Sequence, residues 1–140
     1  MAMYKTDANK KLVKIAGNSI NSNSFFHVNK QITGFTNSSE TPTKTNIDLT
    51  DILPNDGNNY MLLVSFNAWG QGGINKTPQA YLYSSIISEG VRLAGGRNYT
   101  AEDDQIVGSA VIPIASDRYL SLDVLRVSSS RFIIHGYWRC

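Results

Sequence analysis

Residues 118–138, RYLSLDVLRVSSSRFIIHGYW, decide the fold class of this chain. Hydrophobic residues recur at every second position on either side of a serine run, at Leu120, Leu122 and Val124 and then at Phe132, Ile134 and Trp138. A period of two indicates β-strands with one buried face. Ser128–Ser130 has the length of a three-residue hairpin loop. We therefore predict a β-hairpin with strands at 118–127 and 131–138.

Comparable runs precede this stretch. Residues 60–69, YMLLVSFNAW, are the most apolar, and both faces of the run are largely hydrophobic, which predicts a strand buried on both sides. Residues 105–114 alternate, with one face formed by Ile106, Gly108, Ala110, Ile112 and Ile114. Shorter strand candidates lie at 25–35 (two, on either side of Asn29 and Lys30), 46–53, 79–88 and 90–94.

Helical spacing is confined to one ambiguous run, residues 84–94, which Gly90 interrupts. About eight short strands in the last 115 or so residues predict an all-β fold, an antiparallel β-sandwich or jelly roll.

Residues 1–24 differ from the rest of the chain. They hold four lysines against one aspartate, so they carry most of the formal net charge of +2, and they end in an Asn/Ser-rich stretch at 18–24. Asn and Ser side chains compete for the backbone's own hydrogen bonds, which is typical of a linker. We predict an N-terminal leader and linker at 1–24 and a β-sandwich head at 25–140.

The leader has one apolar cluster, made of Lys11, Leu12, Val13, Lys14 and Ile15. The cluster is too short to fold alone. As an attachment segment it could add as a strand to the sheet edge of another protein. A strand of this chain's own domain, or disorder, is the alternative.

Charge and hydropathy argue against two classes of partner. The head carries a net charge near −1 and has no basic stripe with interleaved aromatic residues, so we expect no nucleic-acid binding. No run of 18 apolar residues is present, so we expect no membrane span. The N-terminus lacks the apolar region of a signal peptide, which predicts synthesis in the cytoplasm. Cys140 is the single cysteine and cannot close a disulfide within the chain.

Motifs for catalysis, metals and cofactors are not evident. His27 and His135 lie far apart in strand candidates, and a metal pair would need a third ligand. The acidic run 102–104 is consecutive, whereas a calcium loop alternates its ligands. The glycines at 70–73 open no helix and lack the Gly-Lys-Ser/Thr ending of a phosphate loop. We predict no catalytic residue, no metal site and no cofactor, with a hydrolase as a third-ranked reading.

Aromatic residues with polar tips form the candidate binding or subunit-interface face. Such side chains stack on sugars and mediate protein contacts. Tyr81 and Tyr83 point the same way from one strand. The alternative is a sheet face covered by its own neighbours. The full candidate set is Trp69, Tyr81, Tyr83, Tyr99, Tyr137 and Trp138.

Four stretches resemble small fibre and decoration proteins of tailed bacteriophages. Residues 3–18, MYKTDANKKLVKIAGN, resemble the N-terminal attachment segment of such proteins. Segments similar to those of their globular heads are IDLTDILPNDG at 47–57 followed by Tyr60, VIPI at 111–114 with Arg118, and GYWR at 136–139.

The resemblance implies a non-enzymatic virion structural protein. Its leader would bind other virion proteins, and its head would form a homo-oligomer, with a trimer of tumour necrosis factor-like jelly rolls favoured. The head would serve assembly or binding of a host-surface glycan or receptor. The chain departs from a fibre because it has no shaft of repeats or heptads. The alternative function is a carbohydrate-binding module with an aromatic stacking face.

Overall fold

The computed structural model describes residues 4–6, 12–14, 24–39, 41–70, 78–95 and 105–140, without the side chains of the two leader strands and of residues 94 and 95. All regular structure in these residues is β, and no helix occurs among them. The strands of the head are β3 (Phe25–Thr33), β4 (Thr43–Ile47), β5 (Tyr60–Gly70), β6 (Gln79–Ser84), β7 (Val91–Gly95), β8 (Gln105–Ile114), β9 (Leu120–Leu125) and β10 (Val127–Arg139).

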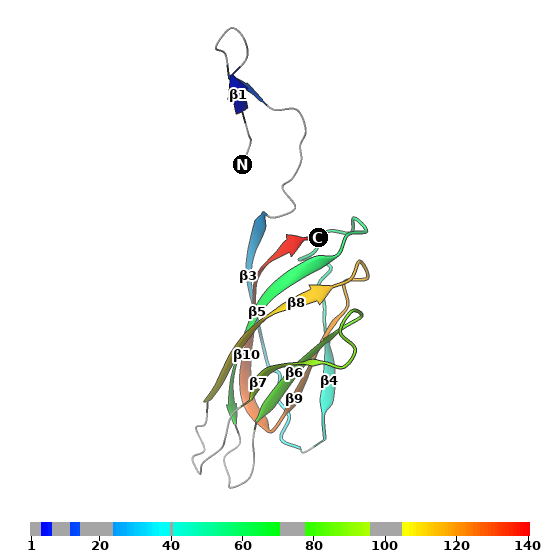
Figure 1. Cartoon of the computed structure of the whole chain (residues 1–140). Helices are drawn as coiled ribbons and strands as arrows, with labels where there is room; N and C mark the ends of the chain where they lie inside the picture. The colour runs from blue at the N-terminus through cyan, green and yellow to red at the C-terminus, as the bar shows by residue number, and fades with distance from the viewer. Residues whose placement is uncertain (1–3, 7–11, 15–23, 40, 71–77, 96–104) are drawn as a thin grey trace.

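The eight head strands form two four-stranded antiparallel sheets, as predicted for a β-sandwich. One sheet has the order β3-β10-β5-β8 and the other the order β4-β9-β6-β7. The first strand therefore pairs with the last, the second with the last but one, and so on inward to β6 and β7. This is the pattern of one long antiparallel ribbon folded across two layers (Figure 1).

The core lies between the two sheets. β5 alternates along its whole length between fully buried and half-buried residues. Its inner face packs in one cluster with the inner faces of the other strands, and the largest side chains with under 2% exposure are Tyr60, Phe66, Phe132, Leu62, Leu82, Ile112, Ile114, Leu120, Leu122 and Ile134. The prediction that residues 60–69 are buried on both sides is wrong, because the residues on the outer side of β5 are only half-buried.

The last two strands do not form the predicted hairpin. β9 ends in one sheet and β10 begins in the other, with Arg126 between them at a φ of 55°. A positive φ is uncommon for a residue other than glycine, and at this single residue the chain passes from one sheet to the other. Ser128 and Ser130 lie within β10 instead of in a loop. Their hydroxyl groups donate to the carbonyl oxygens of Trp69 and Phe35, at 2.9 and 2.6 Å.

A β-bulge in β10 changes which residues face the core. The register shifts between Ile134 and Gly136, against both neighbouring strands. Ile134 and Tyr137 therefore point inward, whereas Trp138 lies opposite Met61 on the outer face. The prediction that Phe132, Ile134 and Trp138 share a face is wrong for Trp138, because one extra residue inverts the alternation. Leu120, Leu122 and Val124 do share the core face.

Two other strand limits differ from the prediction. β3 is one continuous strand, since Asn29 adopts a φ of 54° within it and does not end it. The run 46–53 is a strand only to Ile47. It continues as a buried turn in which the amides of Ile52 and Leu53 both donate to the Leu49 carbonyl.

Hydrogen bonds and an ion pair connect the C-terminal end of β10 to the loop before β5. Asp56 accepts a hydrogen bond from the Tyr60 hydroxyl, and its other oxygen lies 2.6 Å from a guanidinium nitrogen of Arg139. The Tyr60 hydrogen bond lowers the pKa of Asp56 to about 2, and burial together with Asp56 raises the pKa of Tyr60 to about 12. The backbone amide of Cys140 donates to the Asn59 carbonyl at 2.9 Å, beside this network.

The leader has a small sheet of its own. β1 (Tyr4–Thr6) pairs with β2 (Leu12–Lys14) in an antiparallel register, and the pair belongs to neither sheet of the head. Figure 1 shows it beyond the N-terminal end of β3. Leu12, Val13 and Lys14 of the candidate attachment cluster form β2, whereas Lys11 and Ile15 lie outside the described residues.

Candidate functional site

The aromatic residues singled out from the sequence do not form one face. Trp69 and Trp138 lie on the outer face of the β3-β10-β5-β8 sheet. Tyr81 and Tyr83 lie on the outer face of the opposite sheet, because they alternate with the fully buried Ala80 and Leu82. The prediction of a single face fails here because β5 and β6 belong to opposite layers.

One member of the set, Tyr137, lies on neither outer face. The bulge turns Tyr137 into the core, where it is 9% exposed and stacks on Phe26 with the ring centroids 5.1 Å apart. Tyr99 lies outside the described residues. The aromatic candidates therefore divide between two surfaces, which are described in turn.

The first surface, the outer apolar face, covers the β3-β10-β5-β8 sheet. It is defined by hydrophobic side chains that project from all four strands, namely Phe25, Met61, Leu63, Val107, Val111, Pro113, Ile133 and Trp138. Val107 is 70% exposed and Val111 46% exposed. Antiparallel sheets usually turn a polar face to water, so a row of apolar residues here is a departure that needs a cause.

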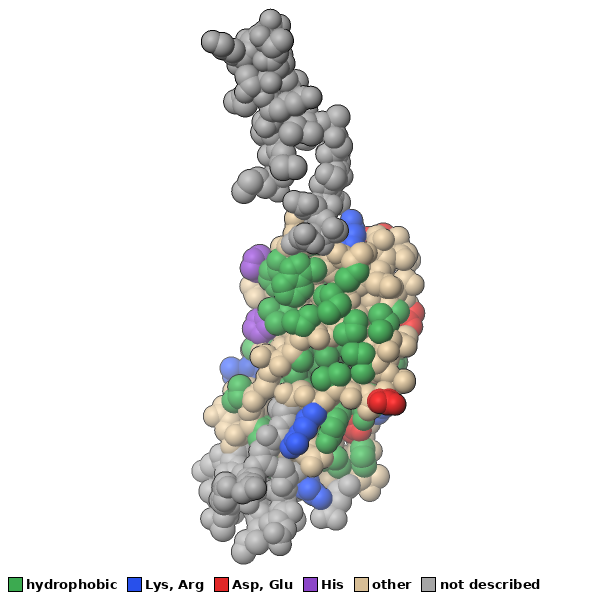
Figure 2. Space-filling view, viewed as in Figure 1, with side chains coloured by type: hydrophobic (Ala, Val, Ile, Leu, Met, Phe, Trp, Pro, Cys, Tyr) green, Lys and Arg blue, Asp and Glu red, His purple; other side chains and the backbone are tan. Residues whose placement is uncertain are grey.

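Aromatic packing organises one end of this face. The Phe25 ring lies 4.6 Å from Trp138 and 4.7 Å from His27, centroid to centroid. Figure 2 shows hydrophobic side chains gathered over the upper part of the head in this view, with the histidines at their margin. No carboxylate projects from the paired, described residues of this face. The hydrophobic side chains gather at this end of the face, and polar side chains together with the charged Arg131 lie farther along it.

One histidine of this face contacts a serine. His135 Nε2 lies 2.8 Å from Ser65 Oγ, a nucleophile and base in hydrogen-bond contact. A triad also needs a carboxylate to orient the imidazole, and the described part of this face offers none. Within the described ranges, no three His, Cys, Asp or Glu side chains lie close enough together to hold a metal ion.

The second surface, the tyrosine face, lies on the outside of the β4-β9-β6-β7 sheet. Strand pairing sets four side chains in one row across it, in the order Lys44, Asp123, Tyr81 and Arg92. The next row along holds Asn46, Ser121 and Tyr83. This face differs from the outer apolar face because charged and hydrogen-bonding groups surround its aromatic rings.

Asp123 is the unusual residue of the tyrosine face. It is 6% exposed, and its Oδ1 atom has no hydrogen-bond partner. Burial raises the pKa of Asp123, and the nearby charge of Lys44 and a backbone hydrogen bond from Thr43 oppose this shift. Burial, followed by the charge of Asp123, also raises the pKa of Tyr83. A buried carboxylate oxygen without a partner costs free energy in the folded state.

Lys44 is placed over the Tyr83 ring. Its ammonium nitrogen lies 3.9 Å from the ring centroid, a cation–π contact. Gly90, which has a φ of +82°, also lies against the ring, and a Cβ atom there would lie 2.8 Å from the ring carbon Cζ. Tyr83 therefore contacts both the Lys44 ammonium group and the backbone at Gly90.

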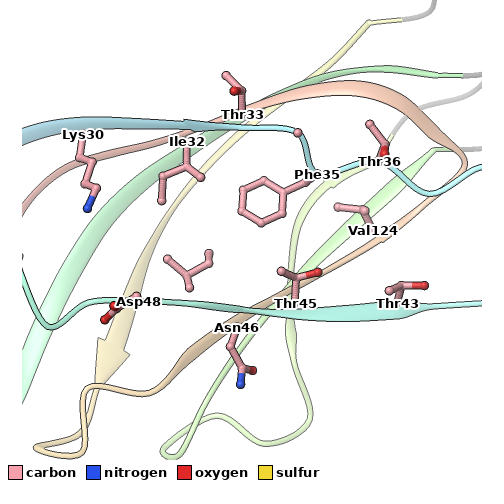
Figure 3. Close-up of a pocket in the computed structure, with 12 residues that line it drawn as sticks. Lys30, Ile32, Thr33, Phe35, Thr36, Thr43, Thr45, Asn46, Asp48 and Val124 are labelled. Carbon is pink, nitrogen blue, oxygen red and sulfur yellow. The ribbon is translucent and has the colours of Figure 1, made fainter.

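A third feature is a cleft at the open side of the sandwich, between the edge strands β3 and β4. It has a volume of about 450 Å³. Figure 3 shows Ile32 and Phe35 pointing into it from one side and Thr45 from the other, with Lys30 and Asp48 at one end. Unpaired edge strands on both sides of an apolar floor give this cleft the geometry for an extended peptide.

Comparison with known proteins gives no family assignment. A scan against protein-family models finds no match, and a search of curated proteins finds none either. No helix in the described part of the chain is suited to cross a membrane. Function is therefore argued from the geometry of the surfaces.

Sequence reasoning missed Asp123 and the outer apolar face as sites. Asp123 alternates with leucine and valine, so by pattern it is an ordinary solvated residue, and only its neighbours on β4 and β6 bury it. The outer apolar face did have a signal, because the hydrophobic outer side of residues 60–69 is visible in the sequence.

Proposed function

We propose that this chain is a non-enzymatic structural protein of a bacteriophage virion, which attaches through its leader and assembles its head through the outer apolar face. The observation that carries the proposal is the uncovered hydrophobic outer side of β5 and its neighbours. Exposed apolar patches of this kind mark sites of protein association. The resemblance of residues 3–18 to phage attachment segments supports the virion setting.

The occupant of the outer apolar face is inferred to be another copy of this chain. Four strands about 4.8 Å apart, with roughly ten residues each at about 3.3 Å, span an area of about 600 Å². Stable interfaces bury about 800 Å² of accessible surface on each partner, so this face supplies about three quarters of the area that self-association requires. Its described, paired residues include no carboxylate, so like-charge repulsion between carboxylates does not oppose the contact.

A jelly-roll head of the tumour necrosis factor-like type belongs to the same proposal. The eight head strands in two antiparallel sheets, with the first strand paired to the last, support this part of the proposal. A trimer is the assembly we favour. In that assembly the leaders would bind other virion proteins, and the loops at the opposite end of the head would meet the surroundings of the particle.

Light scattering on the purified full-length chain tests the proposal. Val111→Asp places a charge on the outer apolar face, on the edge strand β8, and we expect it to convert the oligomer to monomer at tens of micromolar. Asn46→Asp adds the same charge on β4 of the opposite sheet and should leave the oligomer intact. An oligomer that survives Val111→Asp, in a variant whose circular dichroism is unchanged, would contradict the assignment of this face.

A further inference from the structure

Asp123 has the features of a ligand-binding carboxylate instead of a structural one. Structural buried carboxylates have both oxygens satisfied, because each unmatched polar atom destabilises the fold. The Oδ1 atom of Asp123 has no partner, although Lys44 and Tyr81 flank it on the neighbouring strands. The lysine directs its ammonium group to the Tyr83 ring. A buried oxygen without a hydrogen-bond partner indicates that a ligand or a water molecule donates to it.

The neighbours of Asp123 limit the chemistry of a ligand. An anion would meet the carboxylate, so the site is unsuited to phosphate or sulfate groups despite Lys44 and Arg92. A metal ion needs several oxygen or nitrogen ligands, and the described residues contain no cluster of acidic or histidine side chains. What remains available is one strong acceptor, two cationic donors and two tyrosine rings.

These groups match a neutral molecule that has many hydroxyl groups and an apolar ring face. We propose that the tyrosine face binds a sugar ring, which stacks on Tyr83 and donates a hydroxyl hydrogen bond to Asp123. Lys44 and Arg92 then donate to ring or hydroxyl oxygens at the margin. This inference goes beyond the assembly role, because it assigns a recognition function to the sheet opposite the outer apolar face.

Lys44 covers the ring surface on which the sugar would stack. Its ammonium nitrogen lies 3.9 Å from the centroid of the Tyr83 ring. Exposed cation–π contacts contribute only about 0.5–1 kcal/mol, so a ligand displaces the lysine at small cost. Lys44 is the register partner of Asp123 across β4 and β9, so its side chain moves next to the carboxylate when it leaves the ring.

Two binding experiments on the full-length chain test the proposal. The first is an array of mono- and oligosaccharides. The second is saturation-transfer NMR with methyl glycosides of glucose, galactose, N-acetylglucosamine and rhamnose. We expect saturable binding that Asp123→Asn and Tyr83→Leu each weaken by about tenfold or more. Trp69→Ala is the matched control, since it removes an aromatic ring from the opposite sheet and should leave binding unchanged. Binding that survives both site variants, or that is absent across the whole array, overturns the proposal.

Thermal unfolding of the ligand-free chain gives a second readout that needs no ligand. A carboxylate kept for binding destabilises the empty protein, so Asp123→Asn should raise the melting temperature by a few degrees at pH 7. A structural Asp123 gives the opposite result, a lower melting temperature, and this result overturns the proposal even where a saccharide binds elsewhere. Val111→Asp leaves this site untouched, so loss of assembly and loss of sugar binding are separable.

Discussion

Gly136 at the β10 bulge provides a sharp test of the packing between β10 and β3. A Cβ atom at this position would lie well inside van der Waals contact of the Phe26 carbonyl oxygen and would also overlap the Phe25 ring, 2.9 Å from Cε1. The main obstacle is backbone, which cannot rotate away as a side-chain tip can. Gly136→Ala therefore forces β3 away from β10.

The expected loss follows from overpacking. Forcing one extra carbon into a packed site costs about 1–3 kcal/mol, and the backbone obstacle places Gly136→Ala near 3 kcal/mol. With a urea m-value of about 1.5 kcal/mol/M, the unfolding midpoint falls by about 2 M. Fluorescence of Trp138, which lies two residues from the bulge, and of Trp69 reports the transition.

Gly57→Ala is the matched control for this measurement. Gly57 has a φ of +76°, and nothing lies within 4 Å of an added Cβ atom. Its substitution therefore costs only the conformational penalty of a left-handed residue, about 1–2 kcal/mol. A Gly136→Ala midpoint equal to or above that of Gly57→Ala would refute the close approach of the two strands at the bulge.

Two further predictions concern the ends of the chain. Deletion of residues 1–24 should leave the unfolding midpoint of the head equal to that of the full-length chain, since β1 pairs with β2 and with neither head sheet. A truncated chain that is unfolded by circular dichroism would show that the leader is part of the head. Asp56 has its pKa lowered to about 2, chiefly by the Tyr60 hydroxyl, so its stabilisation is complete above its usual pKa near 4 and is lost as the pH falls towards 2. Asp56→Asn should lower the free energy of unfolding at pH 7 and weaken its dependence on pH between 4 and 2, both measured by urea titration. If the free energy of unfolding of the variant fell with pH as steeply as that of the wild type, the Asp56 network would not be the cause of this pH dependence.

The strand content of the head was predictable because alternation is a local property. Ile106 and Ile112 repeat along β8 as the burial pattern of the strand requires, and Leu120, Leu122 and Val124 do so along β9. The two-layer antiparallel arrangement and a count of about eight strands followed from such runs, although residues 25–33 form one strand where two were predicted.

The assignment of strands to sheets was not predictable by the same route. A single residue, Arg126, carries the chain across the sandwich, and a three-serine hairpin loop was the simpler reading of the sequence nearby. The bulge before Gly136 is equally invisible in the pattern, and it reverses the directions of Tyr137 and Trp138. Both features depend on contacts with strands that are distant in the sequence.

The candidate sites show the same division. The hydrophobic outer side of β5 is legible in residues 60–69, although its exposure is not, because exposure depends on the absence of a covering layer. The burial of Asp123 depends on Lys44 and Tyr81, which lie about 80 and 40 residues away in the chain. No local pattern identifies such a residue.

The solution mass of the full-length chain tests the central claim most directly. Self-association through the outer apolar face predicts an oligomer at tens of micromolar, with a trimer at about 46 kDa favoured, three times the 15.4 kDa of one chain. A strict monomer of 15.4 kDa over that concentration range would contradict the account.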